Sequence, residues 1–234
     1  MELAPTHTSR RVNKLARHIK AERYLEIGIA QGATLYHVDV SEKIGVDPVH
    51  NLDVKRMEDA GTVLHKLTSD AFFSEYDGPG FDIIFLDGLH EFEQTFRDLC
   101  SALDVLNPGG CILIDDTVPN SIYSANRSRE DALRWRRYHN VPGTGWHGDV
   151  YKTVFALHDL MLRCDYRTFD SGGNSQTLVW HRPRPDITPV CSTFEQISRL
   201  DYFAVLDHEE IFQKMPEDEL VRLFVRDVQS ASQP

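Results

Sequence analysis

The sequence lacks the features that mark several classes of protein. It has no run of about 18 apolar residues, so no membrane-spanning helix is expected, and the N-terminal stretch MELAPTHTSRRVNKL has no apolar signal core. Only four cysteines are present, without C-x-x-C spacing, which favours buried free thiols in a reducing compartment. These absences predict a cytoplasmic protein.

Positive charge is also scarce. The chain has 25 basic and 36 acidic residues and a formal net charge of −11, which disfavours nucleic acids and anionic membranes as partners. A small molecule is therefore the expected partner. With 234 residues, 41% of them hydrophobic, the chain can form one substantial core. We expect one domain over residues 1–182, followed by a linker and helical C-terminal extension over residues 183–234.

The pattern of apolar residues predicts an α/β fold. A helix is expected over residues 10–20 after a Thr8/Ser9 start signal, and a first strand over residues 23–29. Further short apolar segments alternate with helix-compatible stretches, which is typical of a parallel sheet covered by helices. These segments are residues 43–47, 62–70, 81–88 and 109–116.

The segments that follow predict how the fold is completed. A helix within residues 90–106 should end at the turn Asn107-Pro108-Gly109-Gly110, and residues 117–150 read as an irregular segment over the site. The runs 164–171 and 176–182, joined by Gly172-Gly173-Asn174, predict an antiparallel hairpin. The helical tail is a candidate packing or dimerisation element, so a homodimer is considered.

The stretch YLEIGIAQGATL, residues 24–35, joins an apolar strand to a helix through a glycine turn. Gly28 and Gly32 allow a tight turn close to a ligand. Ala30 stands where a dinucleotide fingerprint requires glycine. The carboxylate of Glu26 suits the ammonium and sulfonium of S-adenosylmethionine, and Asp47, at the end of the next apolar run, suits ribose hydroxyls. An ordinary strand-to-helix turn is the alternative.

Carboxylates recur at the expected carboxyl ends of the strands, where open parallel sheets bind ligands. Ser69 and Asp70 suit the adenine edge. Asp87, Asp115 and Asp116 follow two strands expected to be adjacent, and three clustered carboxylates make an oxygen-rich site for Mg²⁺. The alternative is that these aspartates only cap a helix or turn.

Two further positions have open roles. His90 is a candidate general base, a metal ligand or a helix-start histidine. Asp149 and Lys152 share a helix face, which fits either a surface ion pair or a substrate clamp or base.

The motifs ExGxxxG (Glu26, Gly28, Gly32), FDIIFLDGLHEFEQTFRDL, LNPGGCILIDDTVP and WHGDVYK resemble class I S-adenosylmethionine-dependent methyltransferases. They are most similar to metal-dependent small-molecule O-methyltransferases of cephamycin, macrolide-sugar and coumarin biosynthesis, over residues 10–182. The resemblance implies a Rossmann-like, seven-stranded, mostly parallel sheet with an antiparallel last strand and helices on both faces. It also implies cofactor contacts from the glycine turn, Ala30 included, and from Asp87.

The resemblance further implies Mg²⁺ bound at Asp87, Asp115 and Asp116. Leu89 occupies the place of the aspartate that acts as base in the sugar and coumarin enzymes, so His90 or Lys152 is expected to replace it, unless the metal alone acidifies the acceptor.

The sequence thus predicts an enzyme that transfers a methyl group in line from S-adenosylmethionine to a hydroxyl of a natural product or sugar, with Mg²⁺ assistance. Three alternatives remain open. They are a metal-independent methyltransferase with His90 as base, a nicotinamide-dependent oxidoreductase, which Ala30 and Glu26 disfavour, and a non-catalytic adenosine-binding or scaffold protein.

Overall fold

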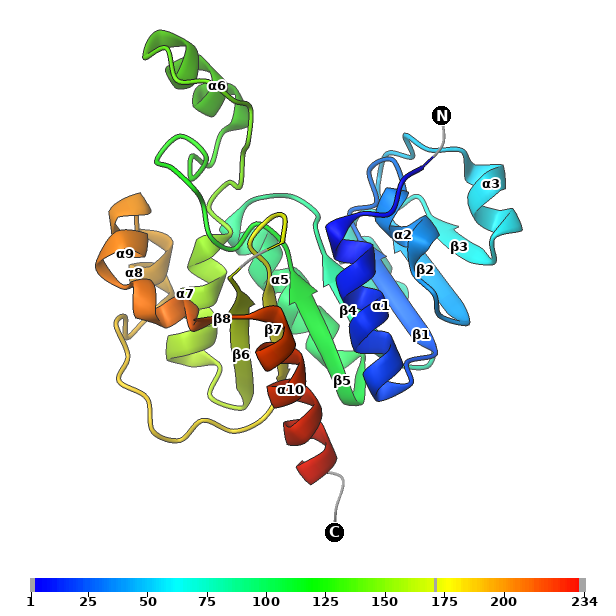
Figure 1. Cartoon of the computed structure of the whole chain (residues 1–234). Coiled ribbons are helices and arrows are strands. Elements are labelled where there is room, and N and C mark those ends of the chain that lie inside the picture. Colours follow the sequence, from blue (N-terminus) through cyan, green and yellow to red (C-terminus); the bar gives the residue numbers. More distant parts are fainter. Residues whose placement is uncertain (1–2, 171, 232–234) are drawn as a thin grey trace. The chain divides into compact units, whose positions relative to one another are not determined.

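The computed structural model describes residues 3–170 and 172–231 (Figure 1). Ser171, in the predicted strand run 164–171, and the last three residues of the predicted tail lie outside that part. The chain forms two compact units. The first contains residues up to Gly88, Arg97–Leu113 and the segment from Glu217, and the second contains Leu89–Phe96 and Ile114–Pro216.

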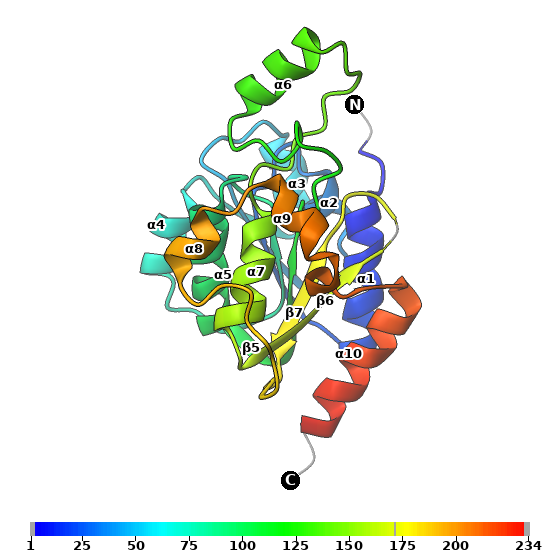
Figure 2. The same cartoon turned by 90° about the vertical axis from the view of Figure 1, so that its left-hand side faces the viewer.

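The first unit is built around five strands in the order β3-β2-β1-β4-β5. The pairs β1·β2, β1·β4 and β2·β3 are all parallel. Figure 2 shows α1 and α10 on one side of these strands and α4 and α5 on the other. The strands are β1 (Arg23–Ile27), β2 (Glu42–Val46), β3 (Thr62–His65), β4 (Phe81–Leu86) and β5 (Leu106–Ile114). The helices are α1 (His7–Ile19), α2 (Ala33–His37), α3 (Val54–Asp59), α4 (Ser69–Glu75), α5 (Phe92–Asp104), which begins in the second unit, and α10 (Glu217–Ala231).

The second unit contains the strand order β7-β6-β8. The pair β6·β7 is antiparallel, which confirms the predicted hairpin, and β6·β8 is parallel. The strands are β6 (Cys164–Phe169), β7 (Thr177–His181) and β8 (Lys214–Met215). The helices are α6 (Arg129–Tyr138), α7 (Tyr151–Leu160), α8 (Phe194–Ser198), α9 (Tyr202–Asp207) and the 3-10 turn η1 (Glu209–Phe212).

The α/β class and the mostly parallel strands are as predicted, but the strand count is not. The described residues form eight strands rather than seven, because β8, from the C-terminal extension, pairs with β6. Sequence patterning could not indicate this strand, since two residues are too few to show alternation. The predicted boundary at residue 182 stays a prediction.

Two helix limits differ from the sequence-based expectation. α1 begins at His7 because Thr6 is its N-cap, with its hydroxyl accepting the Ser9 N–H and the Ser9 side chain returning to the Thr6 backbone. The predicted start at Thr8/Ser9 was therefore too late. The NPGG sequence, predicted to be a turn, lies inside β5. Gly109 adopts φ +82° there, a conformation that glycine tolerates, so the strand continues through it.

Helix α10 belongs to the first unit although it comes from the end of the chain. Leu220, Val221 and Phe224 of α10 are buried. The Glu217 carboxylate at its start accepts a hydrogen bond from the Arg11 guanidinium of α1 at 3.3 Å, and the Arg11 side chain is 1% exposed. Helix α10 thus contributes buried side chains to the core of the first unit.

The irregular segment expected over residues 117–150 contains a helix that the sequence analysis missed. Ser128 caps α6, with its hydroxyl accepting the Asp131 N–H, and Arg136 and Arg137 lie in the last turn. Both are ordinary helix-end signals. Among the described residues, no helix is long and apolar enough to cross a membrane. All four cysteines are free thiols, and three of them are buried.

Candidate cofactor and acceptor sites

The glycine turn after β1 is fixed by its close packing against the backbone that follows β4. Gly28 has φ +83°, and a Cβ placed on it would lie 2.0 Å from the carbonyl oxygen of Asp87. No other residue fits there without moving a strand end. The sequence analysis assigned Gly28 to ligand approach, and the structure adds this packing role within the first unit. Ala30, a non-glycine residue, also has positive φ.

Asp47, directly after β2, holds the same turn. Its Oδ2 accepts the N–H groups of Ile29 at 3.0 Å and Ala30 at 3.2 Å, and its Oδ1 accepts the Val49 N–H at 2.8 Å. A carboxylate offers about four acceptor sites, so these bonds leave room for about one further donor. The ribose role of Asp47 stays a prediction, and its carboxylate also shapes the turn.

Glu26 lies on β1 and is 2% exposed. Its Oε2 accepts a hydrogen bond from the Tyr24 hydroxyl at 2.7 Å. Burial, followed by the charge of Glu26, raises the pKa of Tyr24 well above its usual value, so the phenol keeps its proton and continues to donate. The carboxylate predicted to face the cofactor cation is thus held in one orientation.

The remaining cofactor candidates lie at the ends of β3 and β4. Ser69 and Asp70 begin α4, whose N-cap is Thr68, and the exposed Asp70 carboxylate forms an ion pair with Arg97 at 3.3 Å. Asp87 follows β4, and burial raises its pKa to about 7. All of the predicted cofactor residues belong to the first unit: Glu26, Gly28, Ala30, Gly32, Asp47, Ser69, Asp70 and Asp87.

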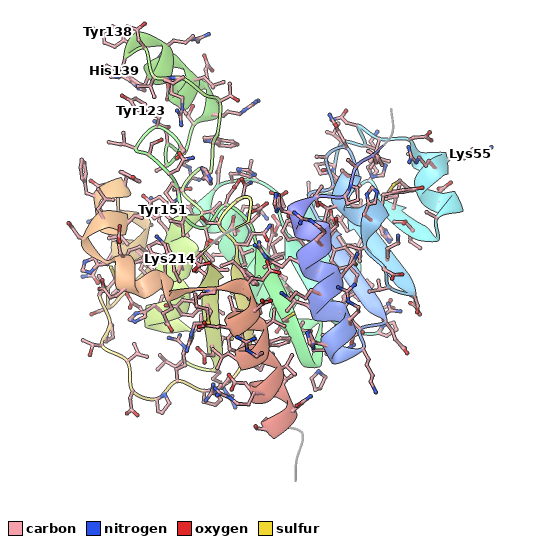
Figure 3. All side chains as sticks on the ribbon, in the orientation of Figure 1. Lys55, Tyr123, Tyr138, His139, Tyr151 and Lys214 are labelled. Carbon is pink, nitrogen blue, oxygen red and sulfur yellow. The ribbon has the colours of Figure 1, made fainter. Side chains whose placement is uncertain are left out.

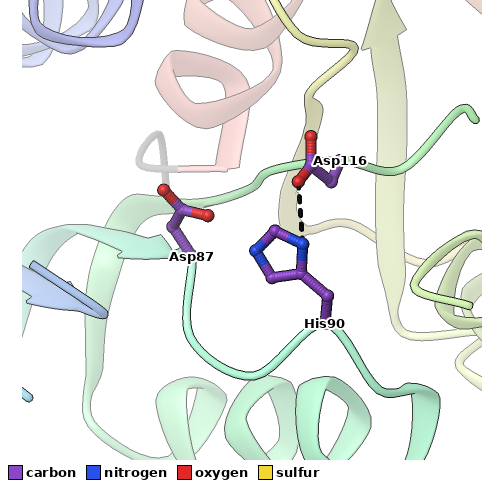
Figure 4. Close-up of side chains that lie close together, drawn as sticks. All are labelled: Asp87, His90 and Asp116. Carbon is purple, nitrogen blue, oxygen red and sulfur yellow. Dashed lines mark ion pairs between the residues drawn. The ribbon is translucent and has the colours of Figure 1, made fainter. Parts of the chain in front are cut away.

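The second unit brings His90 and Asp116 together. His90 Nδ1 lies 3.1 Å from Asp116 Oδ2, and Figure 4 shows the imidazole turned toward that carboxylate. His147 Nε2 lies 3.6 Å from the other oxygen, Oδ1. Asp116 itself has φ +56°, an uncommon conformation for aspartate that is found mostly at turns and functional sites. One carboxylate therefore faces two imidazoles.

The His90 imidazole is supported by the segment just before α7. The ring stacks on Trp146 with 4.8 Å between centroids and 12° between planes. A Cβ on Gly148 would lie 1.8 Å from the His90 carbonyl oxygen, so the two backbones touch. The Trp146 indole donates to the Asn126 carbonyl at 2.6 Å, which fixes the ring on which His90 stacks. The WHGD sequence thus sets the orientation of His90.

Lys152 takes part in a buried network. Its Nζ lies 3.1 Å from Asp149 Oδ2 and donates to the Ser198 carbonyl at 2.8 Å. Asp149 also accepts the Phe92 N–H at 2.8 Å, at the start of α5, and the Arg127 guanidinium at 3.3 Å. This is the ion-pair alternative foreseen for Asp149 and Lys152, but buried rather than at the surface. The network joins α5, α7 and α8.

Asp115 is buried, and its Oδ1 accepts the N–H of Asp116 at 2.9 Å. This contact is the turn-capping alternative considered for the aspartate pair. Its role as a metal ligand stays a prediction. His147, which the sequence analysis did not assign to the site, faces Asp116 although it stands in the WHGDVYK motif next to Trp146. Only the tertiary structure reveals their partners.

Aromatic side chains gather at the end of α6. Figure 3 shows Tyr123, Tyr138 and His139 together, and the Tyr123 hydroxyl lies 3.2 Å from His139 Nδ1. Trp135 stacks on His139 with centroids 5.8 Å apart. Tyr138 is 75% exposed. These residues make an open aromatic surface on the second unit, whereas Arg136 is engaged by the Pro142 and Gly145 carbonyls.

Comparison with known proteins supports the fold and the domain. Residues 15–117 match the family model described as a methyltransferase domain. An O-methyltransferase from Bacillus cereus, solved with SAH, has a TM-score of 0.54 at 16% identity, covering 77% of this chain and 83% of that one. The O-methyltransferase TomG from Streptomyces achromogenes, involved in tomaymycin synthesis and solved with SAM, has a TM-score of 0.52 at 16% identity, covering 77% and 82%.

None of the curated protein sequences compared with the chain matches it significantly. The family model ends at residue 117, directly after Asp115 and Asp116, and so includes every predicted cofactor residue. The structural likeness extends over three quarters of the chain. Residues 15–117 are therefore similar to a methyltransferase domain, and the chain has the fold of the class I, S-adenosylmethionine-dependent O-methyltransferases.

Proposed function

We propose that the protein transfers a methyl group from S-adenosylmethionine to a hydroxyl group of a small molecule, such as a natural product or sugar. The observation that carries the proposal is the pairing of His90 with Asp116 at 3.1 Å, because two groups able to bind or deprotonate a hydroxyl meet there. The solved relatives with SAM or SAH bound agree with this cofactor.

The first unit supplies the cofactor site in this proposal. Bound S-adenosylmethionine would provide the electrophilic methyl group. Glu26 would balance the positive charge of the cofactor, and the remaining acceptor capacity of Asp47 would take a ribose hydroxyl. Ser69 and Asp70 would border the adenine. The glycine turn fixes the backbone between these groups, so little ordering is left for binding to accomplish.

The second unit supplies the acceptor side. His90, held by Trp146, would take the proton of the acceptor hydroxyl or orient its oxygen, and Asp116 would stabilise the imidazolium. A divalent cation suits the carboxylates of Asp115 and Asp116, with Mg²⁺ the ion predicted from oxygen ligands, whereas Asp87, the third predicted ligand, belongs to the first unit. When bound, such an ion would lower the pKa of the acceptor hydroxyl.

A metal-independent route with His90 alone as base is the second candidate, and the contact between His90 and Asp116 supports it as well. Lys152 is a weaker candidate for the base, because Asp149 and Ser198 already engage its amine. We further propose a cytoplasmic location, no nucleic-acid or membrane partner, and the tail as a candidate element for a homodimer.

Calorimetric titration with S-adenosylhomocysteine and, in parallel, NADH tests the cofactor. Binding of S-adenosylhomocysteine without NADH binding is expected, and the reverse result would refute the proposal.

A screen of hydroxylated acceptors with radiolabelled cofactor, with Mg²⁺ and then with chelator, separates the two routes. Changing Asp115 and Asp116 to Asn should abolish turnover but leave cofactor binding intact, and full turnover of this variant in chelator would exclude metal assistance.

A further inference from the structure

The Arg127 side chain, in the segment that leads to α6, contacts three carboxylates from two other segments. Its Nη1 donates to Glu93 Oε2 at 2.5 Å and to Asp149 Oδ2 at 3.3 Å, and its Nη2 donates to Glu91 Oε2 at 2.5 Å. Glu91 and Glu93 stand at the start of α5, and Asp149 stands just before α7. All four residues belong to the second unit. One guanidinium thus joins three stretches of chain that are separated in the sequence.

The same stretches of chain hold His90. Glu91 follows His90 directly. The His90 ring stacks on Trp146 with 4.8 Å between centroids, and the Trp146 indole donates to the Asn126 carbonyl at 2.6 Å. The two ends of this series of contacts meet at Arg127, because it is the next residue after Asn126 and it binds Glu91. The contacts around His90 therefore form a closed loop that Arg127 completes.

We propose that Arg127 is a positioning residue that keeps the His90 imidazole stacked on Trp146. In that orientation His90 Nδ1 lies 3.1 Å from Asp116 Oδ2 (Figure 4). The inference rests on the proposed function in one respect, since it assumes that the acceptor hydroxyl is bound or deprotonated at His90. Arg127 acts on His90 through Glu91 and through the backbone that it shares with the partner of Trp146.

The arrangement of the charges gives Arg127 more influence than a single surface ion pair would have. An isolated exposed pair contributes little to stability, whereas several charges in one network contribute more. The Arg127 side chain is 46% exposed, but that of Asp149 is only 4% exposed, so this pair is partly shielded from water. A planar guanidinium can also face several carboxylate oxygens in a fixed geometry, which an ammonium cannot do.

The Asp149 carboxylate keeps other partners when Arg127 is replaced. Lys152 Nζ lies 3.1 Å from Asp149 Oδ2, and the Phe92 N–H donates to Asp149 Oδ1 at 2.8 Å. This buried carboxylate therefore stays paired in Arg127→Gln, and the variant should fold. The change should loosen the contacts around His90 rather than the core of the unit.

Hydrogen–deuterium exchange, followed by mass spectrometry on the full-length protein, tests the proposal without any acceptor. In Arg127→Gln, the amides of residues 89–93 and 146–149 should exchange about fivefold faster than in wild type, because exchange reports local opening. Arg134→Gln is the matched control, since Arg134 is in the same unit, is 60% exposed and pairs with Asp131 at 2.8 Å within α6. It should leave these amides unchanged. Unchanged exchange in Arg127→Gln, or an equal rise in Arg134→Gln, would overturn the proposal.

Turnover separates positioning from a purely structural role. With an acceptor that the screen identifies, Arg127→Gln should lower kcat by about 10–100-fold, because a small misplacement of a catalytic group is costly. The Kd of S-adenosylhomocysteine should stay unchanged, since the predicted cofactor residues belong to the first unit. Arg127→Lys should regain only part of kcat, because its ammonium lacks the fork of donors. An unchanged kcat, or a Kd that rises by the same factor, would contradict the role of Arg127.

If Arg127→Gln does not fold by circular dichroism, Glu91→Gln decides. It removes the carboxylate next to His90 and leaves the other two partners of Arg127 in place. Exchange of residues 89–93 should become about twofold faster, and no change would refute the proposal. Failure of this inference and failure of the proposed function are distinguishable. A wild-type protein that does not bind S-adenosylhomocysteine contradicts only the proposed function. Unchanged exchange in the variants of a protein that methylates hydroxyls contradicts only the role of Arg127.

Discussion

Replacing Gly28 by alanine should strongly destabilise the first unit. At φ +83°, an alanine would be in the left-handed region, which costs about 1–2 kcal/mol, partly offset by about 0.4–1 kcal/mol from the less flexible unfolded chain. The new Cβ would also lie 2.0 Å from the Asp87 carbonyl oxygen and 2.4 Å from its carbon. Both are backbone atoms held by the end of β4, so they cannot rotate away as a side chain would.

Gly109 provides a matched control for this change. It has φ +82°, almost the same as Gly28, and a Cβ there would meet no atom within 4 Å. Gly109→Ala should therefore show only the conformational part, a loss of about 1 kcal/mol. Gly28→Ala adds overlap with rigid backbone, for which we expect a further loss of about 3 kcal/mol or more.

Urea unfolding of both variants, followed by circular dichroism, measures the two losses directly. The difference between them isolates the contact with Asp87, because the backbone conformations are alike. S-adenosylhomocysteine affinity should also fall for Gly28→Ala and remain close to wild type for Gly109→Ala. If the two variants lose the same stability, the close packing of the glycine turn against the end of β4 is wrong.

Three further predictions concern the first unit. Asp47→Asn should raise the Kd for S-adenosylhomocysteine about tenfold, measured by calorimetry, because charged hydrogen bonds to the turn are lost; an unchanged Kd would argue against this. Glu217→Gln should lower the free energy of unfolding, measured in urea, by about 1–2 kcal/mol, because its partner Arg11 is buried. Asp218→Asn should have no measurable effect, and equal losses would contradict the docking of α10. Burial lowers the pKa of Lys43 from its usual 10.5, so near that pH the unfolded chain binds more protons than the folded chain. Lys43→Met removes the cost of burying this charge and should raise the free energy of unfolding by about 1 kcal/mol at pH 7. The gain should shrink toward pH 10.5, and a gain independent of pH would refute that reasoning.

The local pattern of the sequence was enough to predict much of the fold. The alternation of apolar segments with helices, and the glycine turn at Gly28, follow from interactions between near neighbours in the chain. So does the β6·β7 hairpin, whose turn signal stands between its strands. Helix α6 was missed although Ser128 and Arg137 mark its ends, because its polar composition hid the periodicity.

The site depended more on contacts between distant segments. The sequence indicated His90 and Asp116 as candidates because each follows an expected strand, and the structure then placed them 3.1 Å apart. It could not indicate that Trp146 stacks on His90 or that His147 faces the same carboxylate, since more than fifty residues separate His90 from that segment. Nor could it indicate β8, which exists only as a partner of β6.

The sequence by itself determined the α/β class, the glycine turn after β1 and the positions of the carboxylates, because these depend on periodicity and on the conformational limits of single residues. Only the tertiary structure decided how each side chain is used. It buried Lys152 in an ion pair, turned the Asp115 carboxylate toward the backbone of Asp116, and brought two imidazoles to Asp116. The reason is physical: burial and partner choice depend on chain segments that meet only after folding.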